Sequence, residues 1–217
     1  MAEPYAQFEA ARLVLALRQA GVTDQRIAEA MEKTPREPFV PAAFRDHAWE
    51  NVELPIDCGQ TLTRPVMIGQ ALTALDVHRE HTVLEIGTGS GYAAAILSRL
   101  CRRVYSIDRY RTLTERARAT LDQLGLSRVE LRFADGLKGW PEAAPFGRIV
   151  LWGAVGDLPE LLSRQVSTDH GVALAPVGQG VGQQLVRFAR QLDGAFQRTA
   201  LGPSRFMPLQ AGVAREL

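Results

Sequence analysis

The segment Val83-Leu84-Glu85-Ile86-Gly87-Thr88-Gly89-Ser90-Gly91 decides the fold of this chain. An apolar run typical of a buried strand is followed by three glycines within five residues, and an alanine-rich helical run begins at Tyr92. Glycine lets the backbone turn sharply and lets a ligand approach without meeting a Cβ. The following helix presents free N–H groups and the positive end of its dipole. A strand, a glycine turn and a helix at the start of an α/β sheet predict a nucleotide-cofactor site.

The spacing of the glycines separates two kinds of cofactor. A dinucleotide fingerprint is G-x-G-x-x-G, which seats a pyrophosphate and would predict a nicotinamide oxidoreductase. Here the spacing is G-x-G-x-G, and Tyr92 stands at the position of the third dinucleotide glycine. Glu85, two residues before the first glycine, adds a negative charge that suits a cationic cofactor. S-adenosylmethionine carries a sulfonium, an ammonium and one carboxylate, and is therefore favoured over NAD. A turn without a ligand is disfavoured because three glycines there are costly.

The composition is that of a globular protein without strong charge. The chain has 217 residues and a formal net charge of +1, so it can bury a full core and carries no basic field that would suggest nucleic acid. No apolar run approaches the ~20 residues of a membrane span, and no signal peptide is evident. Cys58, Cys101 and four scattered histidines lack metal-ligand spacing. We therefore expect a cytoplasmic monomer with no metal, no nucleic acid and no membrane partner.

Before residue 81 the sequence predicts helices, and after it strands alternate with helices. We expect residues 1–80 to form an N-terminal helical part with a loop covering the site, and residues 81–217 to form the core, in one compact unit. Strands are expected at residues 82–86, 103–107, 128–133, 148–152 and 172–177, then a hairpin of 184–190 and 196–201 around Asp193-Gly194. A helix is expected at residues 5–20, where Phe8, Ala11, Leu15 and Ala16 recur at helical spacing, and a second helix is expected to begin after an N-cap at Thr23. Further helices are expected at residues 65–75, 90–100, 112–124 and 158–166. This order predicts a doubly wound α/β fold whose sheet is mostly parallel with an antiparallel end.

Three acidic residues fall at the carboxyl ends of successive strands, where α/β sheets bind ligands. Glu85 ends the first strand. Asp108 ends the second, and its carboxylate can accept from both hydroxyls of a ribose. Asp135 follows the third strand, where it could accept from an adenine amino group. Each alone could be a solvated strand end, but three around one glycine turn indicate a nucleoside site.

The residues after the fourth strand bear on the kind of methyl transfer. Amino-group methyltransferases, including those that act on nucleic acid, usually carry an Asn/Asp-Pro-Pro-aromatic loop there, whereas this chain has Trp152-Gly153-Ala154-Val155. The sequence offers no obvious general base either. A carboxylate substrate needs none, because its pKa of ~4 leaves it ionised at neutral pH. The enzyme then has only to align oxygen, methyl carbon and sulfur and to exclude water.

Motifs spread over nearly the whole chain resemble those of the protein-L-isoaspartate O-methyltransferase family. They lie at residues 31–41 (M-x-x-x-P-R-x-x-F-V-P), 54–65 (L-P-I-x-x-G-Q-T-I-S-x-P), 83–92, 135–140 (D-G-x-x-G-W), 176–178 (P-V-G) and 206–209 (F-V-P-L). Many methyltransferases share the glycine turn, but the G-Q-T loop together with P-R-x-x-F-V-P is far more specific. The resemblance implies a Rossmann-like methyltransferase fold. It also implies methyl transfer from S-adenosylmethionine to the α-carboxylate of L-isoaspartyl residues in damaged proteins, which is a repair reaction.

The resemblance implies roles for the residues of the site. The cofactor would be held by Gly59, Gln60, Glu85, Gly87, Thr88, Gly89, Ser90, Gly91, Asp108, Asp135 and Gly136. Thr61, Leu62 and Arg64 would meet the substrate, an isoaspartyl protein or peptide. Thr63 would be catalytic, since its hydroxyl can donate to the carboxylate and orient it; it could also, or instead, be the N-cap of the helix at Pro65.

The substrate half departs from the family pattern. Thr63 stands where Ser is usual, and Arg64 puts a cation near the expected carboxylate. Asp108 stands where Glu is more frequent, and Trp152-Gly153-Ala154 replaces a small run containing Thr or Ala. Two alternatives therefore stay open: a family member that acts on another acid or a specific protein, and a non-catalytic module that binds S-adenosylmethionine.

Overall fold

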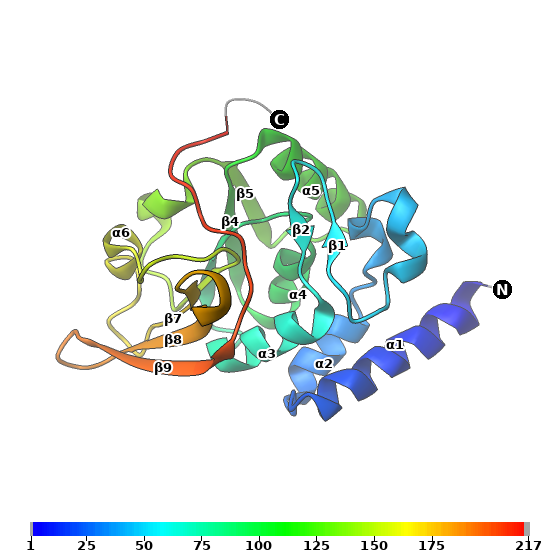
Figure 1. Cartoon of the computed structure of the whole chain (residues 1–217), viewed down its shortest axis with the longest axis horizontal. Helices are drawn as coiled ribbons and strands as arrows, with labels where there is room; N and C mark the ends of the chain where they lie inside the picture. The colour runs from blue at the N-terminus through cyan, green and yellow to red at the C-terminus, as the bar shows by residue number, and fades with distance from the viewer. Residues whose placement is uncertain (1, 215–217) are drawn as a thin grey trace.

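The computed structural model of the chain describes residues 2–214, with side chains from Phe8 onward (Figure 1). A seven-stranded sheet has the order β5-β4-β3-β6-β7-β8-β9. The parallel strands are β5 (Val129–Phe133), β4 (Arg103–Asp108), β3 (Thr82–Ile86), β6 (Arg148–Leu151) and β7 (Val172–Val177). At one edge, β8 (Gln184–Arg190) and β9 (Phe196–Pro203) pair antiparallel. The predicted doubly wound sheet with an antiparallel end is confirmed.

The point at which the strand order reverses positions the site. The chain runs outward from β3 to β4 and β5, and then crosses to β6 on the other side of β3. In open α/β sheets such a reversal opens a crevice at the carboxyl ends of the strands, because the connections leave in opposite directions. The register sets Glu85 of β3 beside Ser106 of β4 and Val150 of β6. Side chains in register on neighbouring strands point to the same face of the sheet.

Five helices lie over one face of the sheet. They are α1 (Ala2–Gln19), α2 (Gln25–Glu32), α3 (Pro65–Leu75), α4 (Tyr92–Leu100) and α5 (Arg111–Gln123). One hydrophobic core joins Leu17 of α1 and Leu72 of α3 to Val83 and Val104 of the sheet, all four fully buried. The other face is covered by α6 (Glu160–Ser163) and by loops with the short 3₁₀ turns η3 (Gly136–Lys138) and η4 (Pro141–Ala143). The remaining 3₁₀ turns are η1 (Glu37–Phe39), η2 (Ala42–His47) and η5 (Gly180–Gly182).

The buried side of α1 differs from the prediction. The helix buries Ala10, Leu13 and Leu17, whereas Phe8 and Leu15, at the predicted apolar spacing, are 61% and 57% exposed. Both sets follow helical spacing, so the sequence of α1 carries two apolar stripes. Only one stripe can face the neighbouring helices α2 and α3, and the spacing alone does not say which.

Two local assignments are also corrected. The N-cap of α2 is Asp24, whose carboxylate accepts from the amide of Arg26, and not Thr23. The helix expected at residues 158–166 is only the single turn of α6, because the chain after it pairs with another segment. Val166 forms a bridge with Phe146, and these strand-like hydrogen bonds use the backbone groups that a longer helix would need.

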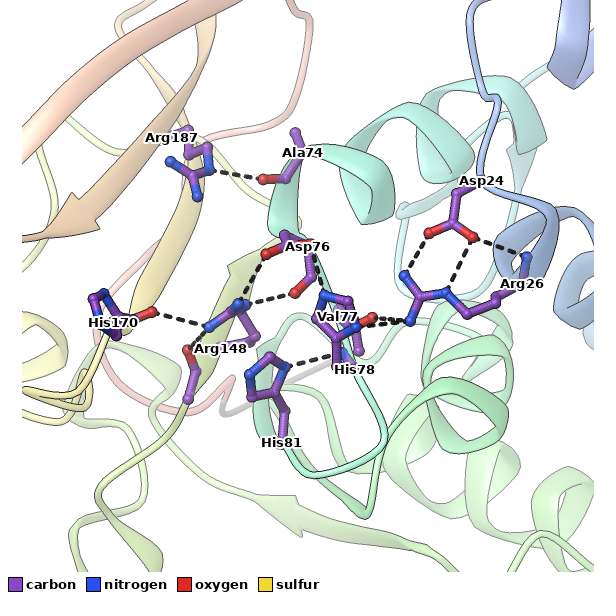
Figure 2. A network of polar contacts seen from close by, with 11 residues as sticks. Asp24, Arg26, Ala74, Asp76, Val77, His78, His81, Arg148, His170 and Arg187 are labelled. Atoms are coloured by element: carbon purple, nitrogen blue, oxygen red, sulfur yellow. Dashed lines mark hydrogen bonds and ion pairs between the residues drawn. The ribbon is translucent and has the colours of Figure 1, made fainter.

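Polar contacts tie the N-terminal helices to the sheet at the amino-terminal ends of its parallel strands, which is the end opposite the crevice (Figure 2). Arg148, buried at the start of β6, donates from Nε to the Asp76 carbonyl at 2.9 Å and from Nη1 to the His170 carbonyl at 3.1 Å. Arg26 of α2 donates to the Val77 carbonyl at 3.0 Å. The Arg148–Asp76 contact and the shared core join residues on both sides of position 80, and the Arg26 contact fastens α2 to the segment that leads from α3 to β3.

Candidate active site

A cavity of about 520 Å³ opens at the carboxyl ends of β3, β4 and β6. Its walls come from segments far apart in the sequence: the glycine turn after β3, residues 107–113, residues 53–63 and the C-terminal residues 205–210. Residues 53–63 contain the hairpin of β1 (Leu54–Pro55) and β2 (Thr61–Leu62), which can be followed in Figure 1 in cyan, with the C-terminal segment in red. The crevice predicted from the strand order is therefore a real cavity.

The glycine turn requires its glycines. Gly87, Gly89 and Gly91 have φ angles of 95°, 54° and 89°, a region that other residues rarely adopt. A Cβ on Gly91 would also lie 3.1 Å from the Cβ of Ala117 on α5. Gly91 therefore lets α4 start and pack closely, while Gly87 and Gly89 leave backbone open to the cavity.

Asp108 lies at the end of β4, nearly buried, in the wall of the cavity. Its Oδ2 accepts from the amide of Gly89 at 2.8 Å and its Oδ1 from the amide of Tyr110 at 2.9 Å. Burial raises the pKa of Asp108, and these amide hydrogen bonds oppose the rise. A carboxylate oxygen can accept more than one hydrogen bond. Asp108 can therefore brace the glycine turn and still accept from a ligand's hydroxyl groups.

Glu85, which the resemblance implied would hold the cofactor, does not line the cavity. Its side chain is fully buried on the helix-covered face of the sheet. Trp152 Nε1 donates to one carboxylate oxygen at 2.8 Å, and the Ser106 hydroxyl donates to the other at 2.5 Å. Burial raises the pKa of Glu85 to about 7, while these two hydrogen bonds oppose the rise.

Arg36 is a structural residue of the site whose role the sequence did not indicate, although it belongs to the P-R-x-x-F-V-P motif. It is almost fully buried, and its guanidinium donates to five backbone carbonyls, those of Ala48, Glu50, Val52, Leu62 and Thr63. Burial lowers the pKa of Arg36 to about 10, so the group stays charged at neutral pH. One cation thus gathers the loop of residues 48–63 and sets the backbone of Thr63.

The C-terminal segment forms the opposite wall. Gln183 accepts from the amide of Phe206 at 2.7 Å and donates to its carbonyl at 3.0 Å. Along this segment, the Ala154 amide donates to the Met207 carbonyl and the Leu209 amide donates to the Ala154 carbonyl, both at 2.8 Å. Arg205, directly before Phe206, is exposed and lines the cavity. Neither Gln183 nor Arg205 was expected at the site, although Arg205 adjoins the F-x-P-L motif.

The structure brings together most of the predicted site residues. Ten line the cavity: Gln60, Thr61, Leu62, Thr63, Gly87, Thr88, Gly89, Ser90, Asp108 and Gly136. Gly59, Arg64, Glu85, Gly91 and Asp135 lie outside its walls. Asp135 caps η3 by accepting from the Leu137 amide at 3.0 Å, which places Gly136 in the wall. Gly59 supplies the turn of the hairpin with a φ of 63°.

Comparison with known proteins decides the family. The profile described as Protein-L-isoaspartate(D-aspartate) O-methyltransferase matches residues 8–214. The chain belongs to the protein-L-isoaspartate O-methyltransferase family. The protein-L-isoaspartate O-methyltransferase of Caulobacter sp. (strain K31) is 48% identical over 204 residues, which cover 94% of this chain and 93% of the relative. That of Maricaulis maris (strain MCS10) is 47% identical over 206 residues, covering 95% and 96%.

Solved structures agree with this assignment. A protein-L-isoaspartate O-methyltransferase superposes with a TM-score of 0.80 at 25% identity, covering 93% of this chain and 66% of that chain. A proposed protein-L-isoaspartate O-methyltransferase from Plasmodium falciparum, solved in complex with S-adenosyl-L-homocysteine, also gives 0.80, at 16% identity and with coverage of 92% and 97%. The second likeness shows the shared fold.

The residues of the cavity fit the cofactor of a protein-L-isoaspartate O-methyltransferase, S-adenosylmethionine. Ser90 Oγ is buried at the glycine turn without a hydrogen-bond partner among the described residues. A buried hydroxyl left alone is costly, so it marks a position where a ligand atom is expected to bind. Asp108 offers acceptors for ribose hydroxyls, and Tyr110 and Leu137 add apolar surface.

Within residues 2–214, no helix combines the length and apolar character that crossing a membrane requires. In the same range, no three His, Cys, Asp or Glu side chains are grouped as a metal ion would require.

Proposed function

We propose that this enzyme binds the damaged segment of a protein between the loop of residues 53–63 (the Thr63 loop) and the C-terminal residues 205–210. The reaction is that of its family: a methyl group passes from S-adenosylmethionine to the α-carboxylate of an L-isoaspartyl residue, the first step of protein repair. The observation that carries the binding proposal is the shared cavity. The glycine turn and Asp108 line it on the β3–β4 side, and Thr63 and Arg205 line it as well.

Methyl transfer to a carboxylate needs alignment and no proton transfer. The α-carboxylate of the substrate is ionised at neutral pH, because its ordinary pKa is ~3.5. S-adenosylmethionine, when bound, supplies an activated methyl group. The part of the chain is to hold the carboxylate in line with that group and to exclude water. Ile56, Leu62 and Phe206 give the cavity apolar walls that serve the second purpose.

The Thr63 hydroxyl is available to orient this carboxylate. The alternative role, as N-cap of α3, is not what the structure shows: the N-cap position is Arg64, without a side-chain cap. Instead, Asn51 Oδ1 accepts from the amide of Val66 at 3.1 Å. Arg36 holds the Thr63 carbonyl at 3.1 Å and so fixes the backbone from which the hydroxyl is presented.

Arg205, and not Arg64, is the cation placed to attract an anionic substrate. Arg205 lines the cavity and has no carboxylate within ion-pair distance among the described residues, whereas Arg64 lies outside the walls. Arg109 also lines the cavity, but its guanidinium is engaged by the Gly212 carbonyl and the Gln210 side chain. We therefore assign to Arg205 the role that the sequence suggested for Arg64.

The decisive assay is methyl transfer from labelled S-adenosylmethionine to two peptides that differ only in one L-isoaspartyl or L-aspartyl residue, read as base-labile label released as methanol. We expect transfer to the isoaspartyl peptide alone. Thr63→Ala should lower kcat about 10- to 100-fold, because a hydrogen bond to a charged group contributes about 1.5–3 kcal/mol, while the cofactor Kd stays unchanged. Thr63→Ser is the matched control and should retain activity.

Arg205→Met and Arg64→Met form a second matched pair. The first should raise the KM for the peptide, and the second should leave it near the value of the unchanged enzyme. Transfer to neither peptide, with cofactor binding intact, would instead support a non-catalytic binding module. Transfer to a different acid would support a changed substrate.

We further propose that the enzyme works as a monomer in the cytoplasm, without nucleic acid, a membrane or a metal, and that residues 1–80 and 81–217 unfold as one unit. The net charge of +1 and the two free thiols, Cys58 and Cys101, support this environment. The core shared by Leu17, Leu72 and Val83 supports the single unit. Light scattering after size-exclusion chromatography tests the first point, and coincidence of fluorescence and circular-dichroism unfolding curves tests the second.

A further inference from the structure

Glu85 is connected to the cavity by two hydrogen-bonded paths, although it does not line the cavity itself. On one side, Trp152 Nε1 donates to Glu85 Oε1 at 2.8 Å. On the other, the Ser106 hydroxyl donates to Glu85 Oε2 at 2.5 Å and bonds to Thr88 Oγ1 at 2.6 Å. Trp152 and Thr88 both line the cavity. A buried carboxylate thus stands behind the glycine turn and reaches the wall through Ser106 and Thr88.

The charge of Glu85 sets the direction of the path through Ser106. An ionised carboxylate can only accept, so Ser106 donates to Glu85 and Thr88 donates to Ser106. The Thr88 hydroxyl then has only lone pairs left for a ligand. A protonated Glu85 donates to Ser106 instead, Ser106 donates to Thr88, and the Thr88 proton is left for a ligand. The ionised form therefore offers an acceptor at the glycine turn, and the protonated form offers a donor.

The surroundings of Glu85 make both forms accessible. Burial raises the pKa of Glu85 to about 7, and the negative charge of Asp108 on β4 adds to the rise. Cys101, after α4, is a titratable group near Glu85: burial raises the pKa of its thiol, and the Glu85 charge adds to the rise. No cation lies within ion-pair distance of Glu85 among the described residues. A cationic ligand in the neighbouring cavity would be the missing partner of this anion.

We propose that Glu85 is a positioning residue for the cofactor: ionised, it favours the cationic S-adenosylmethionine from behind the glycine turn, through Ser106 and Thr88, without touching it. S-adenosylhomocysteine lacks the sulfonium charge, and a buried anion is only weakly screened. Glu85 therefore favours the methyl donor over the spent product. By linkage, binding of the cation favours the ionised form, so a proton is released. The inference rests on the cofactor and not on the acceptor, and a failed isoaspartyl assay would leave it standing.

The test is isothermal titration of the full-length enzyme and Glu85→Gln with S-adenosylmethionine and with S-adenosylhomocysteine, at pH 6 and pH 8. Glutamine keeps the shape: its oxygen accepts from Trp152 and its amide donates to Ser106, so the path is locked in the direction of the protonated form. A group with a pKa of about 7 goes from about one-tenth to about nine-tenths ionised over this range. For S-adenosylmethionine, we divide the Kd of the variant by the Kd of the unchanged enzyme. We therefore expect this Kd ratio to grow about tenfold from pH 6 to pH 8. Titration of the ligand's own ammonium is common to both proteins and cancels in this ratio.

The product serves as the matched ligand control. For S-adenosylhomocysteine, the growth of the same ratio should be clearly smaller, because one positive charge is gone. Titrations in two buffers of different ionisation enthalpy should show release of up to about half a proton at pH 7 by the unchanged enzyme and correspondingly less by the variant. Equal losses for both ligands, or a ratio that does not change with pH, would overturn the proposal, because a structural role alone predicts no dependence on charge.

Two more variants separate the paths. Thr88→Val keeps the branched shape and the Glu85 charge but removes the hydroxyl, and we expect it to weaken S-adenosylmethionine binding and to flatten the pH dependence. A pH dependence identical to that of the unchanged enzyme would refute the path through Thr88. Trp152→Phe removes a donor to the ionised carboxylate, so the midpoint of the pH dependence should rise. A midpoint that falls or stays would contradict the assignment of the titration to Glu85.

Discussion

Replacing Glu85 with Gln is expected to stabilise the ligand-free enzyme at neutral and alkaline pH. The carboxyl is fully buried, and burial raises its pKa from 4.5 to about 7. Between these two pH values the folded protein holds a proton that the unfolded chain has released. The stability linked to Glu85 is therefore fully present below about pH 4.5 and is lost as the pH rises through about 7. Glutamine does not titrate, so the variant escapes this loss.

The size of the effect follows from the pKa. At about 1.4 kcal/mol for each pH unit, the rise from 4.5 to about 7 corresponds to about 3 kcal/mol in the free energy of unfolding. Most of this, about 2–3 kcal/mol, falls between pH 5 and pH 8, a convenient working range. Differences in hydrogen bonding between Glu and Gln add the same amount at every pH. Any change with pH in the difference between the unfolding free energies of the two proteins therefore reports the proton bound by Glu85.

The assay is urea unfolding followed by far-ultraviolet circular dichroism at pH 5, 6, 7 and 8, for both proteins without ligand. The variant should gain about 2–3 kcal/mol relative to the unchanged enzyme from the lowest to the highest pH. Glu115→Gln, at an exposed glutamate on α5, controls for the chemical change. A difference that stays constant with pH would refute the reasoning, and so would one that moves in the opposite direction.

Three further predictions concern the walls of the site. Arg36→Met should lower the free energy of unfolding by about 3 kcal/mol or more, because five buried or partly buried carbonyls lose their donor. Urea unfolding measures this loss, and a value below about 1 kcal/mol would show that water replaces the guanidinium. Gly136→Ala places a Cβ 2.5 Å from Ile86 Cγ2 and should cost about 1–3 kcal/mol in thermal unfolding, whereas Gly182→Ala, with open space around it, should be nearly neutral. Asp108→Asn should raise the cofactor Kd about 10- to 100-fold by titration calorimetry, because a charged acceptor is lost; an unchanged Kd would remove Asp108 from the cofactor site.

Features set by neighbours in sequence were predictable. The helix Pro65–Leu75 and the strand Thr82–Ile86 have the bounds that the sequence predicted, because proline, glycine and apolar periodicity act over a few residues. The glycine turn was predictable for the same reason. Its position at a crevice followed from the strand order, since the carboxyl ends of parallel strands share one edge.

Features set by distant contacts were not predictable. Glu85 was expected to face a cofactor, but its hydrogen-bond donors come from Ser106 and Trp152, which only the strand register brings beside it. Arg64 was favoured over Arg205 because it adjoins the Thr63 loop in sequence. The actual choice depends on the path by which the C-terminal segment returns over the cavity.

Arg36 allows the loop of residues 48–63 to vary in sequence without losing its shape. Its guanidinium donates hydrogen bonds to the carbonyls of residues 48, 50, 52, 62 and 63, all of which are backbone groups. Every amino acid has a carbonyl, so these contacts do not depend on which residues the loop carries. Thr63 and Arg64 could therefore diverge from the family pattern on an unchanged backbone. Specificity at this rim can drift during evolution, or be redesigned in the laboratory, as long as position 36 is kept.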